Sequence, residues 1–134
     1  MTQTLLSADR IRKAQDRAFE DVLVPEWPNE DGTPGVVRIQ ELSASASLRM
    51  HDMVQAAPED GLYLMLVFSA TNTEGQNIFD ISTEETIKAE VDVLRGKNIH
   101  VLNRLQTFAL KLNRRKVDNP NVSGEAASVA SPTA

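Results

Sequence analysis

Side chains that could act as nucleophiles or metal ligands are few in this sequence and stand apart from one another. Ser43, Ser45 and Ser47 alternate along a predicted helix start, where serine hydroxyls cap the backbone, and none lies in the G-x-S-x-G frame of a serine nucleophile. The chain has no cysteine, and the two histidines, His51 and His100, have no second ligand three or four residues away. These spacings favour capping and surface positions over nucleophilic or zinc chemistry.

Three pairs of adjacent carboxylates are the other candidates for acid–base chemistry: Glu30-Asp31, Glu59-Asp60 and Glu84-Glu85. Two pairs stand at predicted helix starts, where the helix dipole favours negative charge, and the third stands in a turn. Adjacent residues on a helix point in different directions, which disfavours a convergent carboxylate dyad. The glycines are dispersed and form no phosphate-binding loop. We therefore expect a protein without enzymatic activity, cofactor or bound metal.

The charges are strongly segregated along the chain, although the net charge is only −5. From Glu59 to Asp92 there are eight acidic residues and one basic residue. From Arg95 to Lys116 there are seven basic residues and no acidic one. This division points to the last predicted helices as a surface of interest.

Three interpretations of the basic stretch remain open. The basic last helix can pair with the acidic helix before it, it can dock an acidic protein partner, or it can contact nucleic-acid phosphates. The acidic pI near 5.0 and the absence of a recognition motif make nucleic acid the least favoured of the three. The candidate partner-binding residues are Arg104, Phe108, Lys111, Arg114 and Arg115.

The first half of the chain predicts an arm, a hairpin and a helix. Residues 1–20 read as a charged N-terminal helix or arm that begins at a Ser7 cap. Two β-branched runs, around Val22–Trp27 and Val36–Ile39, flank a turn at Asp31-Gly32, and the prolines in the first run predict an edge strand. Ser43 can cap the helix that follows, and Pro58 ends it.

The second half predicts mainly helices. The run Leu62–Phe68 is too short for its periodicity to separate a buried strand from a buried helix, although its Leu and Met content favours helix. Ser82 and Glu85 form a predicted capping box, and Asn98 can cap the last helix. The short connection around Gly96 predicts that the last two helices pack as an antiparallel hairpin.

These signals predict an α+β fold, mainly helical, in which a small N-terminal β-hairpin packs with four to five helices. We expect a globular domain over residues 21–116 and a disordered Ser/Ala-rich tail over 117–134. No apolar run approaches the ~20 residues of a membrane span, and the N-terminus lacks the apolar core of a signal peptide. We therefore expect a soluble cytoplasmic protein.

The order of these elements resembles the tail assembly chaperones of long-tailed (siphovirus-type) bacteriophages or prophages, over about residues 20–115. The resemblance rests on an aromatic residue that ends the first strand, a strand-to-helix joint, a polar turn that leads to an apolar pair, and the end of the last helix. The matching residues are Trp27, Arg38, Glu41, Leu42, Ser43, Asn72, Gly75, Ile78, Phe79, Leu110, Leu112 and Asn113.

The resemblance implies a non-enzymatic assembly chaperone that works in the host cytoplasm and is absent from the mature virion. Such proteins bind the tape measure protein, keep it soluble and help tail tube polymerisation, so the tail tube protein and further copies of the chain are also expected partners. The alternative is a head–tail connector or tail-completion protein, and a small nucleic-acid-binding regulator is less favoured.

Overall fold

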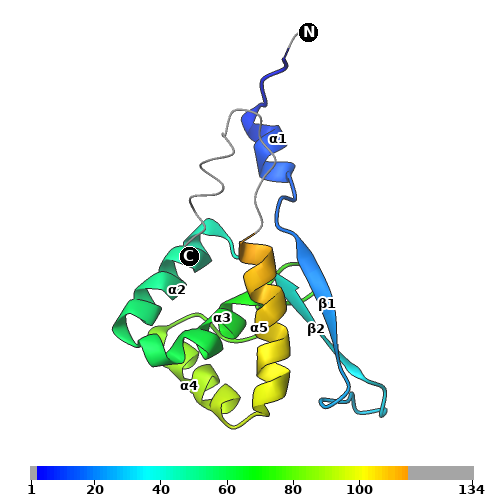
Figure 1. The fold of residues 1–134 in the computed structure, drawn as a ribbon. Coiled ribbons are helices and arrows are strands. Elements are labelled where there is room, and N and C mark those ends of the chain that lie inside the picture. The colour runs from blue at the N-terminus through cyan, green and yellow to red at the C-terminus, as the bar shows by residue number, and fades with distance from the viewer. Residues whose placement is uncertain (1–2, 115–134) are drawn as a thin grey trace.

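The computed structural model describes residues 3–114 of the chain. They form an α+β fold in which helices predominate and a small sheet lies near the N-terminus (Figure 1), which confirms the predicted fold class. The elements in chain order are α1 (Ala8–Lys13), β1 (Phe19–Val24), β2 (Gly35–Gln40), α2 (Ala44–Ala56), the 3-10 turn η1 (Pro58–Asp60), α3 (Gly61–Ser69), β3 (Ala70–Thr71), α4 (Glu84–Arg95) and α5 (Ile99–Asn113).

The sheet is antiparallel, with the strand order β1-β2-β3. The predicted hairpin and its turn are confirmed, and β1 is an edge strand as predicted, although the prolines on which that prediction rested follow the strand. The first strand is Phe19–Val24 and not the predicted run around Val22–Trp27, because Pro25 has no N–H to donate to the ladder. Strand β3 was not predicted, since it is only two residues long and directly follows α3.

The core is built around α3. Leu64, Leu66, Val67 and Phe68 of this helix are buried, and α2, α4 and α5 all pack against it. A helix that is apolar on all sides must be buried on all sides. The run Leu62–Phe68 lies within α3, which confirms the preference for helix over strand.

Helix α5 lies between α3 and the sheet. Its buried Val101 and Leu105 join the same core as Val22 and Ile39 from the inner face of the hairpin. Helices α4 and α5 are consecutive, but both make their main contacts with α3 and not with each other. Residues 96–98 connect them at one end of the molecule (Figure 1).

Helix caps decide where several elements begin. The predicted caps Ser7, Ser43 and Asn98 are confirmed, since each side chain accepts a hydrogen bond from a backbone N–H in the first turn of its helix. These three helices therefore begin where local sequence signals place them.

The predicted capping box of α4 is wrong by one residue. The box is formed by Thr83 and Thr86, and not by Ser82 and Glu85. Ser82 donates both its backbone N–H (2.9 Å) and its hydroxyl (2.6 Å) to the Asp80 carboxylate, so it belongs to the preceding turn.

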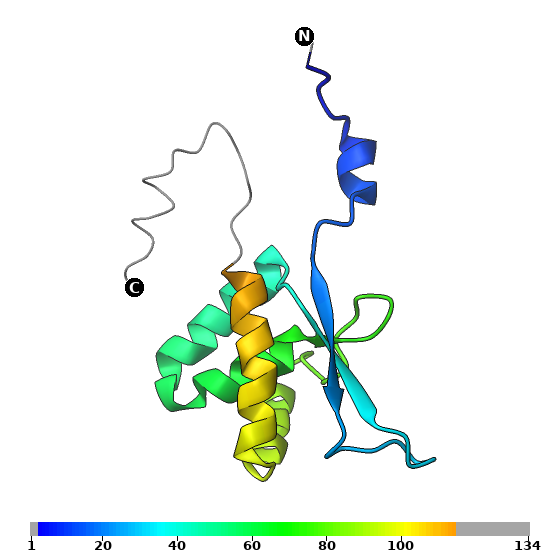
Figure 2. The ribbon, with the colours of Figure 1, turned by 45° about the vertical axis from the view of Figure 1, so that its right-hand side comes forward.

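The N-terminal arm, residues 3–16, stands away from the body of the fold. No residue of α1 is buried, and the helix projects beyond the end of the sheet that is opposite to the α4–α5 connection (Figures 1 and 2). The helix ends at Lys13, and the chain then reaches the sheet, where Arg17 and Ala18 form hydrogen bonds with Gln40 and Glu41. The predicted tail over 117–134 lies outside the described residues. Among residues 3–114, no helix is long and apolar enough to cross a membrane.

Candidate partner-binding site

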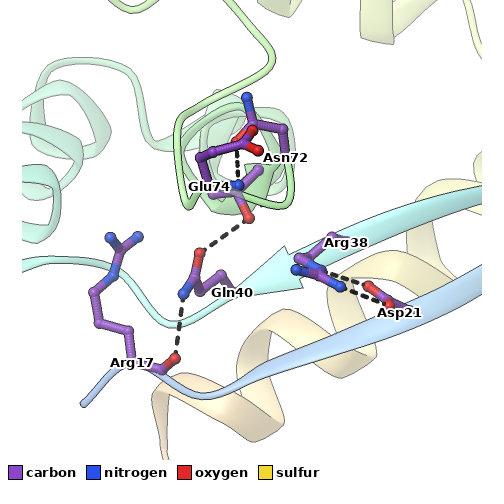
Figure 3. A network of polar contacts seen from close by, with 7 residues as sticks. Arg17, Asp21, Arg38, Gln40, Asn72 and Glu74 are labelled. Atoms are coloured by element: carbon purple, nitrogen blue, oxygen red, sulfur yellow. Dashed lines mark hydrogen bonds and ion pairs between the residues drawn. The ribbon is translucent and has the colours of Figure 1, made fainter. Parts of the chain in front are cut away.

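Polar contacts hold the end of the sheet where the arm leaves it (Figure 3). The Gln40 side chain donates to the carbonyl oxygen of Arg17 (3.2 Å) and accepts from the Thr71 hydroxyl (3.0 Å), so it joins the chain before β1 to strand β3. In the adjacent turn, Asn72 accepts a hydrogen bond from the backbone N–H of Glu74 (2.9 Å). This network has a structural role at the sheet end.

Arg38 lies on the outer face of the sheet. Its guanidinium donates two hydrogen bonds to Asp21, at 2.7 and 2.9 Å, and lies 3.8 Å from the centre of the Phe19 ring. The hydrogen bonds from Arg38 hold the pKa of Asp21 below its ordinary value. Arg38 therefore stabilises the β1–β2 pair.

Glu41 and Leu42 form the joint between β2 and α2. The Glu41 carboxylate accepts a hydrogen bond from the backbone N–H of Ala18 (2.7 Å). The backbone carbonyl oxygen of Glu41 accepts one from the Arg17 side chain (2.8 Å). The Leu42 N–H donates to the side chain of Asn113 at the end of α5 (2.9 Å). The joint is thus fixed both to the residues that connect the arm to β1 and to the last helix.

An apolar groove of about 290 Å³ lies at the other end of the fold, between the hairpin, the segment before α4 and the α4–α5 connection. Trp27 and Phe79, both half-buried, line it. The side chains of Ile78 and Val93 also line it and remain 54% and 52% exposed. The full lining is Trp27, Val37, Ile39, Leu66, Ala70, Ile78, Phe79, Val93, Leu94, Lys97 and Leu105.

Two glycines shape the segments that bring Phe79 and Trp27 to the groove. Gly75 has a φ of +79° and donates its N–H to the carbonyl oxygen of Asn72 (3.0 Å), which closes the turn that leads to Phe79. Gly35 lies against the backbone of Trp27 so closely that a β-carbon at this position would overlap with the Trp27 carbonyl oxygen. Only glycine lets the chain around Trp27 pack against β2 in this way.

Lys97 supplies the only basic side chain of the groove lining, and it makes no ion pair within residues 3–114. Sequence reasoning missed Lys97 and Val93 as site residues. Val93 carried a usable signal, because it is a large apolar residue outside the buried Ile87, Val91 and Leu94 stripe of α4.

The predicted basic residues of α5 do not form one patch. Arg104 binds Glu26, with nitrogen–oxygen distances of 2.6 and 2.8 Å, and its hydrogen bonds lower the pKa of Glu26 to about 2. Phe108 is half-buried against the core. Lys111 and Arg114 are exposed without an ion pair among the described residues, and Arg115 lies outside them.

One interpretation was that the basic last helix pairs with the acidic helix before it. The described structure contains no ion pair between α4 and α5. Arg104 pairs instead with the segment after β1, and Arg95 pairs with Asp60 and Asp92. Val101 of α5 is fully buried because α3 covers this helix on one side and the sheet covers it on the other.

The residues with potential for acid–base or metal chemistry remain dispersed. His51 and His100 are exposed, and Ser43 is occupied as the α2 cap. Within the part of the chain that the structure describes, no group of three or more His, Asp or Glu residues could hold a metal ion. The apolar groove is therefore the feature with the clearest capacity to bind a partner.

No protein-family model matches the chain, and no curated protein matches it by sequence. Among solved structures, the tail assembly chaperone of bacteriophage HK97 matches with a TM-score of 0.53 and 22% sequence identity. The match covers 81% of this chain and 95% of that one. The chain therefore has the fold of a bacteriophage tail assembly chaperone.

Proposed function

We propose that the protein is a non-enzymatic phage tail assembly chaperone that binds the tape measure protein and keeps it soluble while the tail tube polymerises. The observation that carries the proposal is the shared fold with the HK97 tail assembly chaperone, which extends over 95% of that protein.

The apolar groove supplies a physical basis for this binding. A tape measure protein is long and helical, and an amphipathic helix buries its apolar face in such a groove through residues spaced three or four apart. Trp27 and Phe79 form the groove wall, while Ile78 and Val93 offer apolar surface that water contacts in the free protein. Lys97 at the groove can pair with a carboxylate that flanks the apolar face of the bound helix.

Charge supports the same role in two ways. The net charge of −5 helps to keep a complex with a poorly soluble partner in solution. Lys111 and Arg114, which are exposed near the end of α5, can steer an acidic segment of the partner towards the protein. Their contribution is to the rate of encounter, and it decreases with added salt.

Co-expression with the tape measure protein of the same genome tests the proposed function. We expect the tape measure protein to become soluble and to copurify with this chain. An equally insoluble tape measure protein in the presence and absence of the chain contradicts the proposal.

Mass analysis of purified virions tests the proposed location. We expect the chain in the host cytoplasm during assembly and not in finished particles. A fixed number of copies in every virion contradicts the chaperone role and favours a connector or tail-completion protein.

A further inference from the structure

The N-terminal arm carries apolar side chains that no part of its own fold covers. Leu5, Leu6 and Ile11 are 90%, 67% and 61% exposed. Arg10 and Arg12 of the arm make no ion pair within residues 3–114, whereas Lys13 pairs with Asp9. The arm thus presents an apolar segment followed by unpaired positive charge.

The groove surface complements the arm, because an apolar part is followed by negative charge. Its apolar part shares Ile78 and Phe79 with an adjoining open hollow, which is lined by the carboxylates of Asp80 and Glu90. Neither carboxylate pairs with a cation among the described residues. Hydrogen bonds from Ser82 lower the pKa of Asp80.

We propose that the arm of one copy docks into the groove of a second copy. Leu5 and Leu6 enter the apolar part, and Arg10 and Arg12 reach Asp80 and Glu90 in the adjoining hollow. Leu6 lies just before the Ser7 cap of α1, and Arg10 and Arg12 lie within this helix, so apolar side chains and positive charges follow one another along the arm.

A second copy is the occupant because of where the arm leaves the fold. The arm points away from the body at the end of the sheet opposite to the α4–α5 connection, which borders the groove (Figures 1 and 2). Arg17 and Ala18 donate hydrogen bonds to Glu41, and the Gln40 side chain donates to the carbonyl oxygen of Arg17, which fixes the base of the arm in that direction.

This contact is head-to-tail, since each copy offers an arm at one end and a groove at the other. Heterologous contacts of this kind form open chains or closed rings. An arm in the groove also competes with any other segment that binds there. The proposal concerns the groove of the proposed function, but its test needs only this chain, so the two can fail separately.

Complementation between two defective variants tests the proposal. The first variant, Leu5→Asp with Leu6→Asp, has a damaged arm and an intact groove. The second, Val93→Asp, has a damaged groove and an intact arm, and Val93 is exposed enough to tolerate the charge. Light scattering after size exclusion should show concentration-dependent oligomers for the wild type and monomers for each variant alone. Their mixture should form a 1:1 heterodimer.

Matched controls separate docking from folding. Thr4→Asp in the arm and Leu48→Asp, an exposed position on α2, should leave self-association unchanged, whereas the two test variants should weaken it about tenfold or more. A monomeric wild type, oligomers that persist in either test variant, or variants that do not recombine each overturn the proposal.

Discussion

The backbone N–H of Leu42 donates a hydrogen bond of 2.9 Å to the side-chain oxygen of Asn113, 71 positions further along the chain. The amide nitrogen of Asn113 in turn donates to the carbonyl oxygen of Ala109 (2.8 Å), which fixes the side chain on its own helix. This single contact closes the joint between sheet and α2 onto the end of α5.

Replacement of Asn113 should weaken the fold without affecting the groove. Asn113→Ala leaves the Leu42 N–H without its acceptor, so we expect the free energy of unfolding to fall by about 1 kcal/mol in urea titrations. Asn113→Asp keeps the acceptor oxygen and should cost less. Asn103→Ala, at an exposed position of the same helix, is the matched control, and an equal effect of both alanine variants contradicts this role.

Gly35→Ala should displace Trp27 from the groove wall. The added β-carbon overlaps with the backbone of Trp27, so we expect a loss of about 1–3 kcal/mol of stability and a red shift of tryptophan fluorescence. The chain has one tryptophan, so the fluorescence reports this site alone. Gly61→Ala, where a β-carbon meets nothing within 4 Å, should leave the spectrum unchanged. An unshifted spectrum in Gly35→Ala contradicts the close packing.

Removal of two neighbouring buried hydroxyls, those of Ser69 and Thr71, should have different effects on the stability of the fold. The Ser69 hydroxyl is buried and has no hydrogen-bond partner among the described residues, so Ser69→Ala should leave stability unchanged or raise it by up to about 1 kcal/mol. The Thr71 hydroxyl donates to Gln40, so Thr71→Val should lower the unfolding free energy by about 1 kcal/mol. Thermal unfolding of both variants checks this, and losses of equal size contradict it.

The ion pair between Arg104 and Glu26 should make stability depend on pH in the acidic range. The pKa of Glu26 falls from 4.5 to about 2 in the folded protein, because Arg104 donates hydrogen bonds to its carboxylate. The stabilisation is therefore complete above about pH 4.5 and is lost as the pH falls through about 2.

Arg104→Gln tests this dependence. The variant should be less stable than the wild type at pH 6, and the difference in unfolding midpoint should disappear near pH 2. Lys111→Gln, which removes an exposed charge without an ion pair in the described structure, should follow the wild-type pH profile. A constant difference between Arg104→Gln and wild type over the whole range contradicts the assigned pKa shift.

Much of the fold could be predicted from the sequence because its signals are local. Ser43 and Asn98 cap helices through backbone groups two or three residues away, and Gly32 has the positive φ that its turn requires. Pro25 ends β1 because proline has no backbone N–H to donate to the ladder. None of these effects needs knowledge of distant contacts.

The remaining features depend on tertiary contacts that local patterns do not contain. Strand β3 forms because Ala70 pairs with Ile39 of β2. Ser82 does not cap α4, because it donates its hydrogen bonds to Asp80. The groove combines Trp27 with Val93 from a distant helix. The charge pattern identified α5 as basic, but it did not show that Arg104 would pair with Glu26.

Binding of a soluble tape measure segment to purified chain tests the central claim most directly. The segment should be an amphipathic helix from the tape measure protein, titrated against wild type, Val93→Asp and Leu48→Asp by calorimetry. Val93 lines the groove, whereas Leu48 is an exposed apolar residue on α2 that does not line it. We predict that Val93→Asp weakens binding about tenfold or more and that Leu48→Asp binds as the wild type does. Equal affinities for all three proteins, or no binding by the wild type, would contradict the account.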